Sequence, residues 1–355
     1  MLKSSIVILS AFVTPFRSGA EACVEEVSSR LKDRFDITIV TARLRRDLPG
    51  RDVLNGVNVV RVGIGSSADK WFFPVLAPFA AKKLRPQIVH AVLESYAGAA
   101  MMFCGCIVPG AKRILTCQST NTSFLVSAMH KLADRVTVIS SVLVERAKKF
   151  GRSDVTLIPN GIPYGAIREE CSKTPKVTGR ILFVGRLEQM KGVDTLLAAL
   201  RLLKEKTGQI PDLHVIGDGS LRGVLEAQSR SFLSEGSFYG YLPPAEVQRE
   251  MAEAEIFVGL SRSEALGNVF LEAQAAGCAV VGTNVGGIPD IVKNGANGLL
   301  VPADDPAKAS VAIEKLLKDS PERLRLSEAG IAFAKQYDWQ GIAEKYASVY
   351  EASLR

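Results

Sequence analysis

The chain alternates short apolar runs with segments of helical periodicity, and it does so in two successive series. The first series contains runs such as IVILSAF, ITIVTA and VNVVRV, and the second contains RILFVG, LHVIG and EIFVGL. Segments such as ACVEEVSSRLKDR lie between the runs and repeat apolar residues at helical spacing. Strands that alternate with helices favour a parallel sheet covered on both faces. The sequence therefore predicts an α/β protein with two doubly wound domains.

The two series meet in a segment rich in proline and glycine. LIPNGIPYGAI is followed there by EECSKTPKVTG, which is polar and has no period. Such a segment is the best candidate for a domain boundary. We expect residues 1–165 to form one domain and residues 166–337 to form the other, and the length of 355 residues agrees with two cores. A last helical pattern, at about 338–355, could dock on either domain.

Charge is divided unevenly along the chain, whose net charge is +7. Residues 1–165 contain 22 Lys and Arg against 12 Asp and Glu, whereas residues 166–355 contain 22 against 25. The basic half suggests an anionic partner, and charge alone allows a membrane surface, a phosphorylated acceptor or nucleic acid. No motif supports nucleic acid. No apolar run approaches the roughly 20 residues that span a bilayer.

The opening residues and the cysteines bear on the compartment. Residues 1–16 contain an apolar run without a small-x-small cleavage site, so a buried first strand is expected rather than a signal peptide. The six cysteines and three histidines have no zinc spacing and suggest free thiols in a reducing compartment. We expect a cytoplasmic protein, at most peripheral at the inner face of the membrane.

The segment DKWFFPVLAPFAAKKLRP, residues 69–86, joins aromatic side chains to a basic cluster. Aromatic residues next to lysines and arginines are what an interfacial helix needs. A partly buried helix with a solvated basic end is an equally good interpretation, since Pro74 and Pro78 interrupt a clean helical period. The residues concerned are Trp71, Phe72, Phe73, Leu76, Phe79, Lys82, Lys83 and Arg85.

Ligands of open α/β sheets bind outside the carboxyl ends of the strands, so the loops there hold the candidate site residues. In SRSEALGNVFLEAQAAG, Glu264 and Glu272 lie on either side of Gly267 and Asn268. A strand, a glycine turn and a helix form an anion site, because free helix N–H groups point at the turn. Either carboxylate could hold a pair of sugar hydroxyls. An ordinary strand–turn–helix unit with two solvated glutamates is the alternative.

Further candidates follow other predicted strands. Arg186 and Lys191, in GRLEQMKG, would suit a diphosphate because each cation neutralises charge on a leaving anion. Gly19 would let backbone amides approach a phosphate, although a tight turn explains it almost as well. Gly217 opens a G-x-G-x-x-x-G segment that is one residue too long for the dinucleotide fingerprint, so a nicotinamide site is disfavoured. The chain has neither a P-loop nor a D-x-D motif, and no metal is expected.

The first half offers polar residues at two predicted strand ends. His90 could act as a base or contact a sugar, and Glu94 follows four residues later. A packed or capped imidazole is the alternative for His90. The next loop offers groups that could bind hydroxyls, namely Gln118, Ser119, Thr120 and Asn121.

Taken together, these segments resemble the retaining GT-B glycosyltransferases of family 4, the glycosyl transferases group 1. Five pieces match in order: the early S-G-A-E loop, I-P-N-G-I at 158–162, F-V-G-R-L…K-G at 183–192, the E-x7-E pair, and G-G-I-P-D-I-V…N-G-A-N-G-L-L-V-P at 286–302. The likeness covers essentially the whole chain. It implies two Rossmann-like domains that face each other across a cleft, with the donor mainly on the second domain and the last helix crossing back onto the first.

The resemblance also implies roles for individual residues. Arg186 and Lys191 would hold the donor diphosphate, Glu264 would contact the donor sugar, and Glu272 would hold the ribose hydroxyls. Backbone amides around Gly267–Val269 and at Gly19 would reach the phosphates, and the base would lie near Tyr241 and Leu242.

The chain departs from the family pattern at two places. Many relatives carry H-x-H after the strand that holds His90, and this chain has Val92 at the second position, so another group or the donor's own phosphate becomes the better candidate for the base. The usual E-G-F-G is E-A-L-G at 264–267, which leaves the sugar open.

We therefore expect a metal-independent, hexosyltransferase-type enzyme that moves a sugar from a nucleotide sugar, UDP- or GDP-linked, to a glycan or lipid-linked acceptor with retention. No cofactor is expected beyond the nucleotide-sugar co-substrate. Two alternatives stay open: a sugar-nucleotide-binding protein without transferase activity, and a GT-B epimerase, which the E-x7-E match disfavours. A soluble acceptor competes with a membrane-proximal one.

Overall fold

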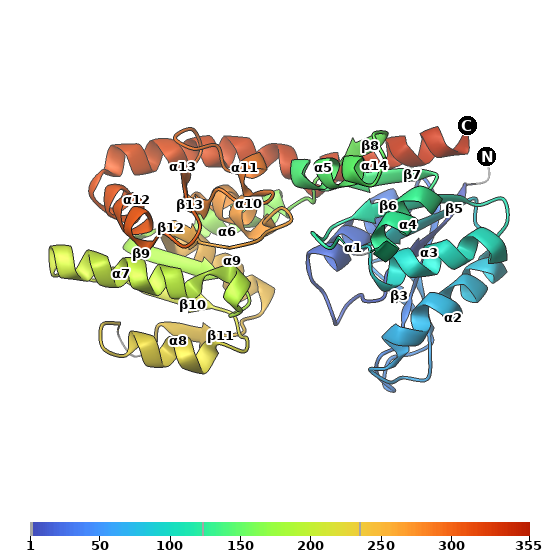
Figure 1. Ribbon diagram of the computed structural model, residues 1–355, viewed down its shortest axis with the longest axis horizontal. Helices are drawn as coiled ribbons and strands as arrows, with labels where there is room; N and C mark the ends of the chain where they lie inside the picture. Colours follow the sequence, from blue (N-terminus) through green and yellow to red (C-terminus); the bar gives the residue numbers. More distant parts are fainter. Residues whose placement is uncertain (1–2, 123, 234–235) are drawn as a thin grey trace. The chain divides into compact units, whose positions relative to one another are not determined.

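The structure, a computed structural model, describes residues 3–122, 124–233 and 236–355 (Figure 1). The chain divides into two compact units. Unit 1 is Met1–Gly161 together with Trp339–Arg355, and unit 2 is Ile162–Asp338. Residues 162–165, which the sequence had assigned to the first domain, thus lie in unit 2, where helix α6 begins at Tyr164.

Unit 1 is built on an eight-stranded sheet with the order β3-β4-β2-β1-β5-β6-β7-β8. Its pairs are parallel except β3 with β4. The strands are β1 Ser5–Leu9, β2 Asp36–Ala42, β3 Arg51–Leu54, β4 Val57–Val62, β5 Ile88–Val92, β6 Lys112–Cys117, β7 Arg135–Val138 and β8 Val155–Leu157. The helices are α1 Gly19–Leu31, α2 Asp69–Leu84, α3 Tyr96–Ile107, α4 Phe124–Leu132, α5 Ser141–Lys149 and α14 Trp339–Leu354.

The strand order of unit 1 places helices on both faces of its sheet. The connection from β1 through α1 to β2 and the connection from β4 through α2 to β5 run in opposite directions along the sheet. Because such crossovers are right-handed, α1 and α2 cover opposite faces. Helix α14 packs with α1 in the core that contains Ile6 and Ile8. Its Trp339, Tyr346 and Tyr350 are among the largest fully buried side chains.

Unit 2 is built on a six-stranded sheet, all parallel, with the order β11-β10-β9-β12-β13-β14. The strands are β9 Val177–Val184, β10 Leu213–Ile216, β11 Phe238–Gly240, β12 Ala254–Gly259, β13 Ala279–Thr283 and β14 Leu299–Val301. The helices are α6 Tyr164–Lys173, α7 Val193–Thr207, α8 Arg222–Ser229, α9 Pro244–Glu253, α10 Asn268–Ala275, α11 Ile288–Ile291, α12 Pro306–Lys318 and α13 Ser320–Ala334. Two short 3-10 helices are η1 Gln189–Lys191 and η2 Lys335–Tyr337.

The prediction of two α/β units with parallel sheets is confirmed. The central strands are buried on both faces, and every residue of β10 and β13 is buried. This burial explains why these strands appear in the sequence as unbroken apolar runs. Among the residues that the structure describes, no helix has the length and apolar character needed to span a bilayer.

Candidate functional site

The candidate residues of unit 2 meet where the strand order of its sheet reverses direction. Strand β9 pairs with β10 on one side and with β12 on the other, so the loops after β9 and β12 are neighbours. The carboxyl ends of the strands at such a switch point are where open α/β sheets bind ligands. The ammonium of Lys191 lies 2.5 Å from a carboxylate oxygen of Glu264, and the two side chains are 19% and 16% exposed. Two residues 73 positions apart in the chain thus form one ion pair.

Glycines allow the loop after β12 to lie against its neighbours. Gly192 has φ +66°, and a Cβ there would lie 1.9 Å from the carbonyl oxygen of Leu260. Gly286 has φ +55°, and a Cβ there would lie equally close to the carbonyl oxygen of Glu264. Only glycine fits both the backbone conformation and the close approach. The peptide of Glu264 is also bound by the amide of Gly287, at 3.0 Å.

Arg262 joins the two loops, and the sequence interpretation passed over it. Its amide donates to the carbonyl of Met190 at 2.8 Å. Its guanidinium donates to both carboxylate oxygens of Asp194, at 2.8 and 3.0 Å, and to Asp304 at 2.7 Å. The hydrogen bond with Asp194 raises the pKa of Arg262 above its ordinary value. Arg262 therefore fixes η1, which carries Lys191, against the loop that carries Glu264.

Arg186 lies on the loop after β9 and is exposed. Its guanidinium contacts the sulfur of Met190 at 3.7 Å. Within the described residues it forms no ion pair with a carboxylate, unlike Lys191. An exposed guanidinium at this edge can meet an anionic ligand without first breaking a salt bridge.

Helix α10 begins beside Glu264 with a glycine N-cap. Gly267 has φ +93° and has no side chain to cover the first amides of the helix. The next two residues, Asn268 and Val269, are half-buried, as is Glu272 one turn into the helix. The buried Phe270, edge-on to Phe257 at 5.3 Å, fixes the helix on the sheet. The predicted strand, turn and helix are therefore present, and they carry the E-x7-E pair.

Gly217 and Tyr241 complete this edge of unit 2. Gly217 follows β10 with φ +131°, and a Cβ there would lie 1.9 Å from the carbonyl oxygen of Gly185. The close packing of the backbone at Gly217 against the backbone at Gly185 thus explains why position 217 is a glycine. Tyr241 and the half-buried Leu242 follow β11, and Tyr241 is among the most exposed large side chains described.

In unit 1 the structure corrects the expectation for His90. Its Nδ1 lies 2.8 Å from the hydroxyl of Tyr350, its Nε2 lies 2.6 Å from the hydroxyl of Thr116, and the side chain is fully enclosed. Burial lowers the pKa of His90 to about 3. A neutral imidazole with both nitrogens occupied in the core cannot act as a base for a substrate, so His90 has a packing role.

Glu94 is likewise internal, and it shapes the loop that follows β6. Its carboxylate pairs with Arg146 and accepts from the amides of Gln118, at 2.8 Å, and Ser119, at 3.1 Å. The guanidinium of Arg146 also donates to the carbonyl of Asn121 at 2.8 Å. Glu94 therefore positions this loop and offers no free oxygen to an acceptor.

The loop itself presents polar groups. Thr120 and Asn121 are exposed and Ser119 is half-buried. Gln118 is buried. Its side-chain oxygen Oε1 accepts a hydrogen bond from the side-chain Nδ2 of Asn160, in the I-P-N-G-I segment, at 2.8 Å. Among the residues that the structure describes, two buried atoms of this pair, Gln118 Nε2 and Asn160 Oδ1, have no hydrogen-bond partner. Gln118 Nε2 can donate a hydrogen bond to a ligand hydroxyl or water, and Asn160 Oδ1 can accept one.

Gly19 begins α1 and is exposed. Ser18 caps the helix, and its amide donates to the carboxylate of Glu21 at 2.9 Å. This capping box already satisfies one amide next to Gly19.

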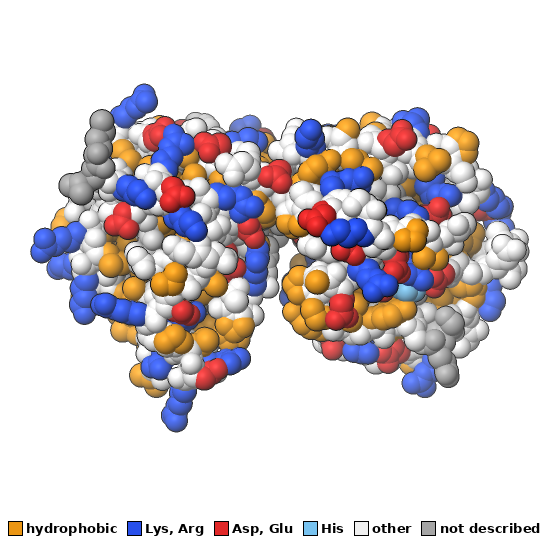
Figure 2. Space-filling view, turned by 180° about the vertical axis from the view of Figure 1, so that it is seen from behind, with side chains coloured by type: hydrophobic (Ala, Val, Ile, Leu, Met, Phe, Trp, Pro, Cys, Tyr) orange, Lys and Arg blue, Asp and Glu red, His pale blue; other side chains and the backbone are white. Residues whose placement is uncertain are grey.

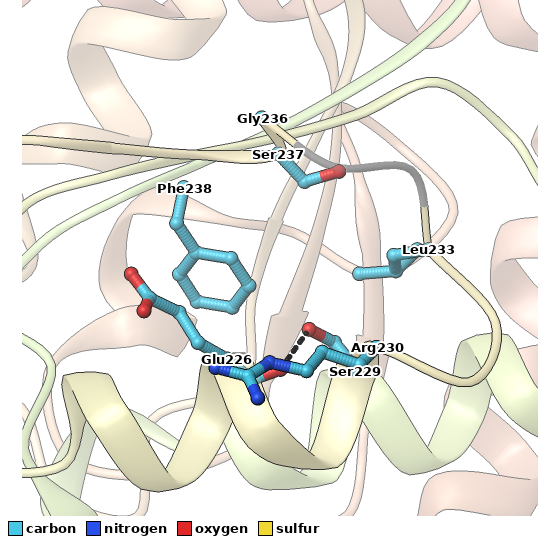
Figure 3. A pocket seen from close by; sticks show the side chains of 7 residues that line it. All are labelled: Glu226, Ser229, Arg230, Leu233, Gly236, Ser237 and Phe238. Atoms are coloured by element: carbon cyan, nitrogen blue, oxygen red, sulfur yellow. Dashed lines mark hydrogen bonds between the residues drawn. The ribbon is translucent and has the colours of Figure 1, made fainter.

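Unit 2 also contains a cavity of about 360 Å³ (Figure 3), and none of the candidate residues lines it. It is formed by the end of α8 and the amino end of β11, where the Ser229 hydroxyl donates to the carbonyl of Glu226 at 2.9 Å. It is lined by Glu226, Ser229, Arg230, Leu233, Gly236, Ser237 and Phe238. Its place at the amino end of a strand separates it from the switch point. Across the described residues, no cluster of three or more His, Cys, Asp or Glu side chains could hold a metal ion.

Comparison with known proteins gives matches over both units. The family model "Glycosyltransferase Family 4" matches residues 17–164, and "Glycosyl transferases group 1" matches residues 169–333. A D-inositol 3-phosphate glycosyltransferase of Corynebacterium diphtheriae is 34% identical over 188 residues, which are 51% of this chain and 44% of that protein. The matched part thus spans about half the length of such curated relatives.

Solved structures resemble the chain over nearly its whole length. Sucrose-phosphate synthase from Thermosynechococcus elongatus has a TM-score of 0.82 at 19% identity and covers 99% of each chain. Anabaena Alr3699/HepE, solved in complex with UDP-glucose, has a TM-score of 0.78 at 17% identity, with 98% of this chain and 99% of that chain covered. These likenesses establish the GT-B fold. The two family models together match both units, and the chain therefore belongs to the family 4, or group 1, glycosyltransferases.

Proposed function

We propose that the protein is a retaining glycosyltransferase that moves a sugar from a nucleotide-sugar donor to an acceptor hydroxyl in polysaccharide, glycolipid or other glycoconjugate assembly. The observation that carries the proposal is the pairing of Lys191 with Glu264 at the switch point, beside the glycine-capped start of α10. This arrangement puts a cation, a carboxylate and free helix amides at one edge of unit 2.

The donor diphosphate would bind at the edge of unit 2 where cations and helix amides favour an anion. Arg186 approaches it from the loop after β9, Lys191 from η1, and the first amides of α10 add the positive end of the helix dipole. A UDP- or GDP-linked sugar is the donor that we propose, and the HepE complex with UDP-glucose supports this class. Glu264 would then bind sugar hydroxyls, and Glu272 the ribose hydroxyls, each through two carboxylate oxygens.

The transfer would proceed on one face of the sugar. The bond from the anomeric carbon to the diphosphate oxygen breaks, and the bond to the acceptor oxygen forms on the same side. Arg186 and Lys191 stabilise the negative charge that develops on the leaving diphosphate, so this step needs no metal ion. The acceptor proton goes to a phosphate oxygen of the donor or to a group near Tyr241 and Leu242. No carboxylate is assigned as a nucleophile, and we propose no covalent intermediate.

The acceptor is a glycan or a lipid-linked sugar bound by unit 1. The Gln118–Asn160 pair and the loop through Asn121 supply hydroxyl-binding groups there. The basic first half favours an acceptor near an anionic membrane, and we place the protein in the cytoplasm or at the inner face of the membrane.

Donor binding and product analysis test the proposal. We expect Lys191→Ala and Glu272→Ala to weaken binding of UDP- or GDP-sugars in titration calorimetry, while Lys308→Ala, on the exposed start of α12, binds as the wild type does. Nuclear magnetic resonance of the product should show the anomeric configuration of the donor. Donor affinity equal to wild type in both site variants would refute the assignment, and donor binding without hydrolysis or transfer would favour a binding protein.

A further inference from the structure

Helix α2 of unit 1 exposes a row of large apolar side chains. Trp71 is 67% exposed, Phe72 59%, Val75 51% and Phe79 53%, with Leu76 between them. Neighbours in this set are three or four positions apart, as in Phe72 and Val75 or Val75 and Phe79, which places them along one side of the helix. We call this row, from Trp71 to Phe79, the α2 face. A contiguous exposed apolar patch marks an interaction surface, since monomeric proteins rarely carry one without a function.

The opposite side of α2 holds the helix in place. Phe73, Ala77 and Ala81 recur every four residues and are fully buried against the sheet and α3. The Trp71 ring meets Tyr96 of α3 edge-on at 5.2 Å. This packing fixes which side of the helix faces outward, so the α2 face is built into the fold of unit 1.

The exposed charged side chains on α2 itself have a single sign. Lys82, Lys83 and Arg85 end the helix and are exposed, and the Lys70 ammonium lies 5.9 Å from the ring centre of Trp71. The one acidic residue of α2 is Asp69, which is buried and accepts from the amides of the preceding loop. On the face of the molecule that Figure 2 shows, Lys and Arg side chains are interspersed with Asp and Glu. On α2 the apolar row is therefore accompanied by exposed cations and by no exposed carboxylate.

A groove adjoins the α2 face. It has a volume of about 320 Å³ and lies between α2 and the β3–β4 pair. Leu76 and Phe79 form part of its apolar wall, and Lys83 and Arg51 supply cations from its two sides. Neither cation is in an ion pair within the described residues. Such a groove can take a phosphate headgroup beside an acyl chain.

We propose that the α2 face and its groove dock on a bilayer that contains anionic phospholipid. The aromatic side chains would enter the boundary between headgroups and acyl chains, while Lys82, Lys83 and Arg51 contact lipid phosphates. A second copy of the chain suits this surface poorly, because pairing of like faces would bring the lysines together. This docking surface rests on the proposed function, which includes an anionic membrane as a partner. It adds the part of unit 1 that would contact that membrane.

Vesicle co-sedimentation tests this surface in the full chain. The wild type should pellet with vesicles of equimolar phosphatidylcholine and phosphatidylglycerol, and much less with phosphatidylcholine alone. Lys82→Gln with Lys83→Gln should weaken partitioning about fivefold for each charge removed. Trp71→Ser with Phe72→Ser should weaken it about tenfold, since buried apolar area sets much of the binding strength.

Two matched controls make the result specific. Lys148→Gln with Lys149→Gln removes the same charge from the exposed end of α5 in the same unit. Val311→Ser with Leu324→Ser removes two exposed apolar side chains from unit 2. Both controls should partition as the wild type does. A thermal shift with UDP or GDP, unchanged in the α2 variants, would show that they are folded and that the donor site is independent.

Three outcomes would overturn the docking surface. They are wild-type sedimentation in both α2 variants, equal binding to neutral and anionic vesicles, and a lipid-free dimer that the Trp71 and Phe72 changes abolish. Each of these leaves donor binding as it was. Loss of donor affinity in Lys191→Ala is measured separately, so failure of the docking surface and failure of the proposed function are distinguishable.

Discussion

Lys191 and Glu264 neutralise each other across the switch point of unit 2, with 2.5 Å between ammonium and carboxylate. In the proposed function an anionic donor would compete with Glu264 for this ammonium, and the hydroxyls of the donor sugar could then bind the carboxylate oxygens that Lys191 leaves. Because the ion pair already holds both side chains in place, less side-chain entropy would be lost when a donor binds.

We expect Lys191→Ala to lower kcat/KM by about two orders of magnitude, which is about 2.7 kcal/mol of transition-state stabilisation. The substitution removes a cation from the leaving diphosphate and leaves Glu264 unpaired beside it. Lys191→Arg should recover part of the loss, because it keeps the charge. Steady-state kinetics with the preferred nucleotide sugar would check this, and activity of Lys191→Ala close to wild type would contradict the role.

Arg262→Ala should raise the donor KM more than it lowers kcat. The substitution frees Asp194 and Asp304 and loosens η1, yet Arg262 itself need not touch the reacting atoms. Because both carboxylates are more than a third exposed, the loss in unfolding free energy should stay near 1 kcal/mol. Kinetics and urea unfolding measure the two effects, and Arg249→Ala, on an exposed i,i+4 pair of α9, is the control.

Much of the fold could be predicted because buried parallel strands leave apolar runs in the sequence. Pro74 and Pro78 argued against a regular helix, yet α2 runs from Asp69 to Leu84. Burial of Phe73, Ala77 and Ala81 along one side outweighs the lost backbone hydrogen bonds.

The candidate site could be predicted only in part. Loop positions at strand ends follow from the sequence, but the contact of Lys191 with Glu264 depends on β9 pairing with β12, which lies three strands later. Arg262 was missed because its partner Asp194 lies 68 residues away. The sequence left a packed imidazole as one of two interpretations of His90, and it could not decide between them because the Tyr350 hydroxyl that contacts its Nδ1 lies 260 residues further along the chain.

Gly192→Ala should destabilise unit 2 strongly, by about 3 kcal/mol, because a Cβ would meet the Leu260 carbonyl at 1.9 Å in a left-handed conformation. Gly208→Ala is the matched control. Its φ is +73°, similar to that of Gly192, but no atom lies within 4 Å of the new Cβ. Only the conformational cost of about 1 kcal/mol should remain there. Urea unfolding of both variants separates the two contributions, and equal losses would show that the loop yields to the methyl group.

His90 should make the protein less stable as the pH falls, without affecting donor binding. Burial lowers its pKa to about 3 in the folded chain, whereas an unfolded histidine has a pKa of about 6.5. Between these values the unfolded state binds the additional proton, so unfolding becomes easier by up to about 1.4 kcal/mol per pH unit as the pH drops below 6.5. His130, whose pKa burial lowers to about 4, contributes in the same direction. His90→Gln should lose the His90 part of this slope in urea unfolding from pH 7 to pH 5, while donor affinity at pH 7 stays at the wild-type value. An unchanged slope would mean that His90 is protonated in the folded state, and a large fall in donor affinity would return it to the candidate site.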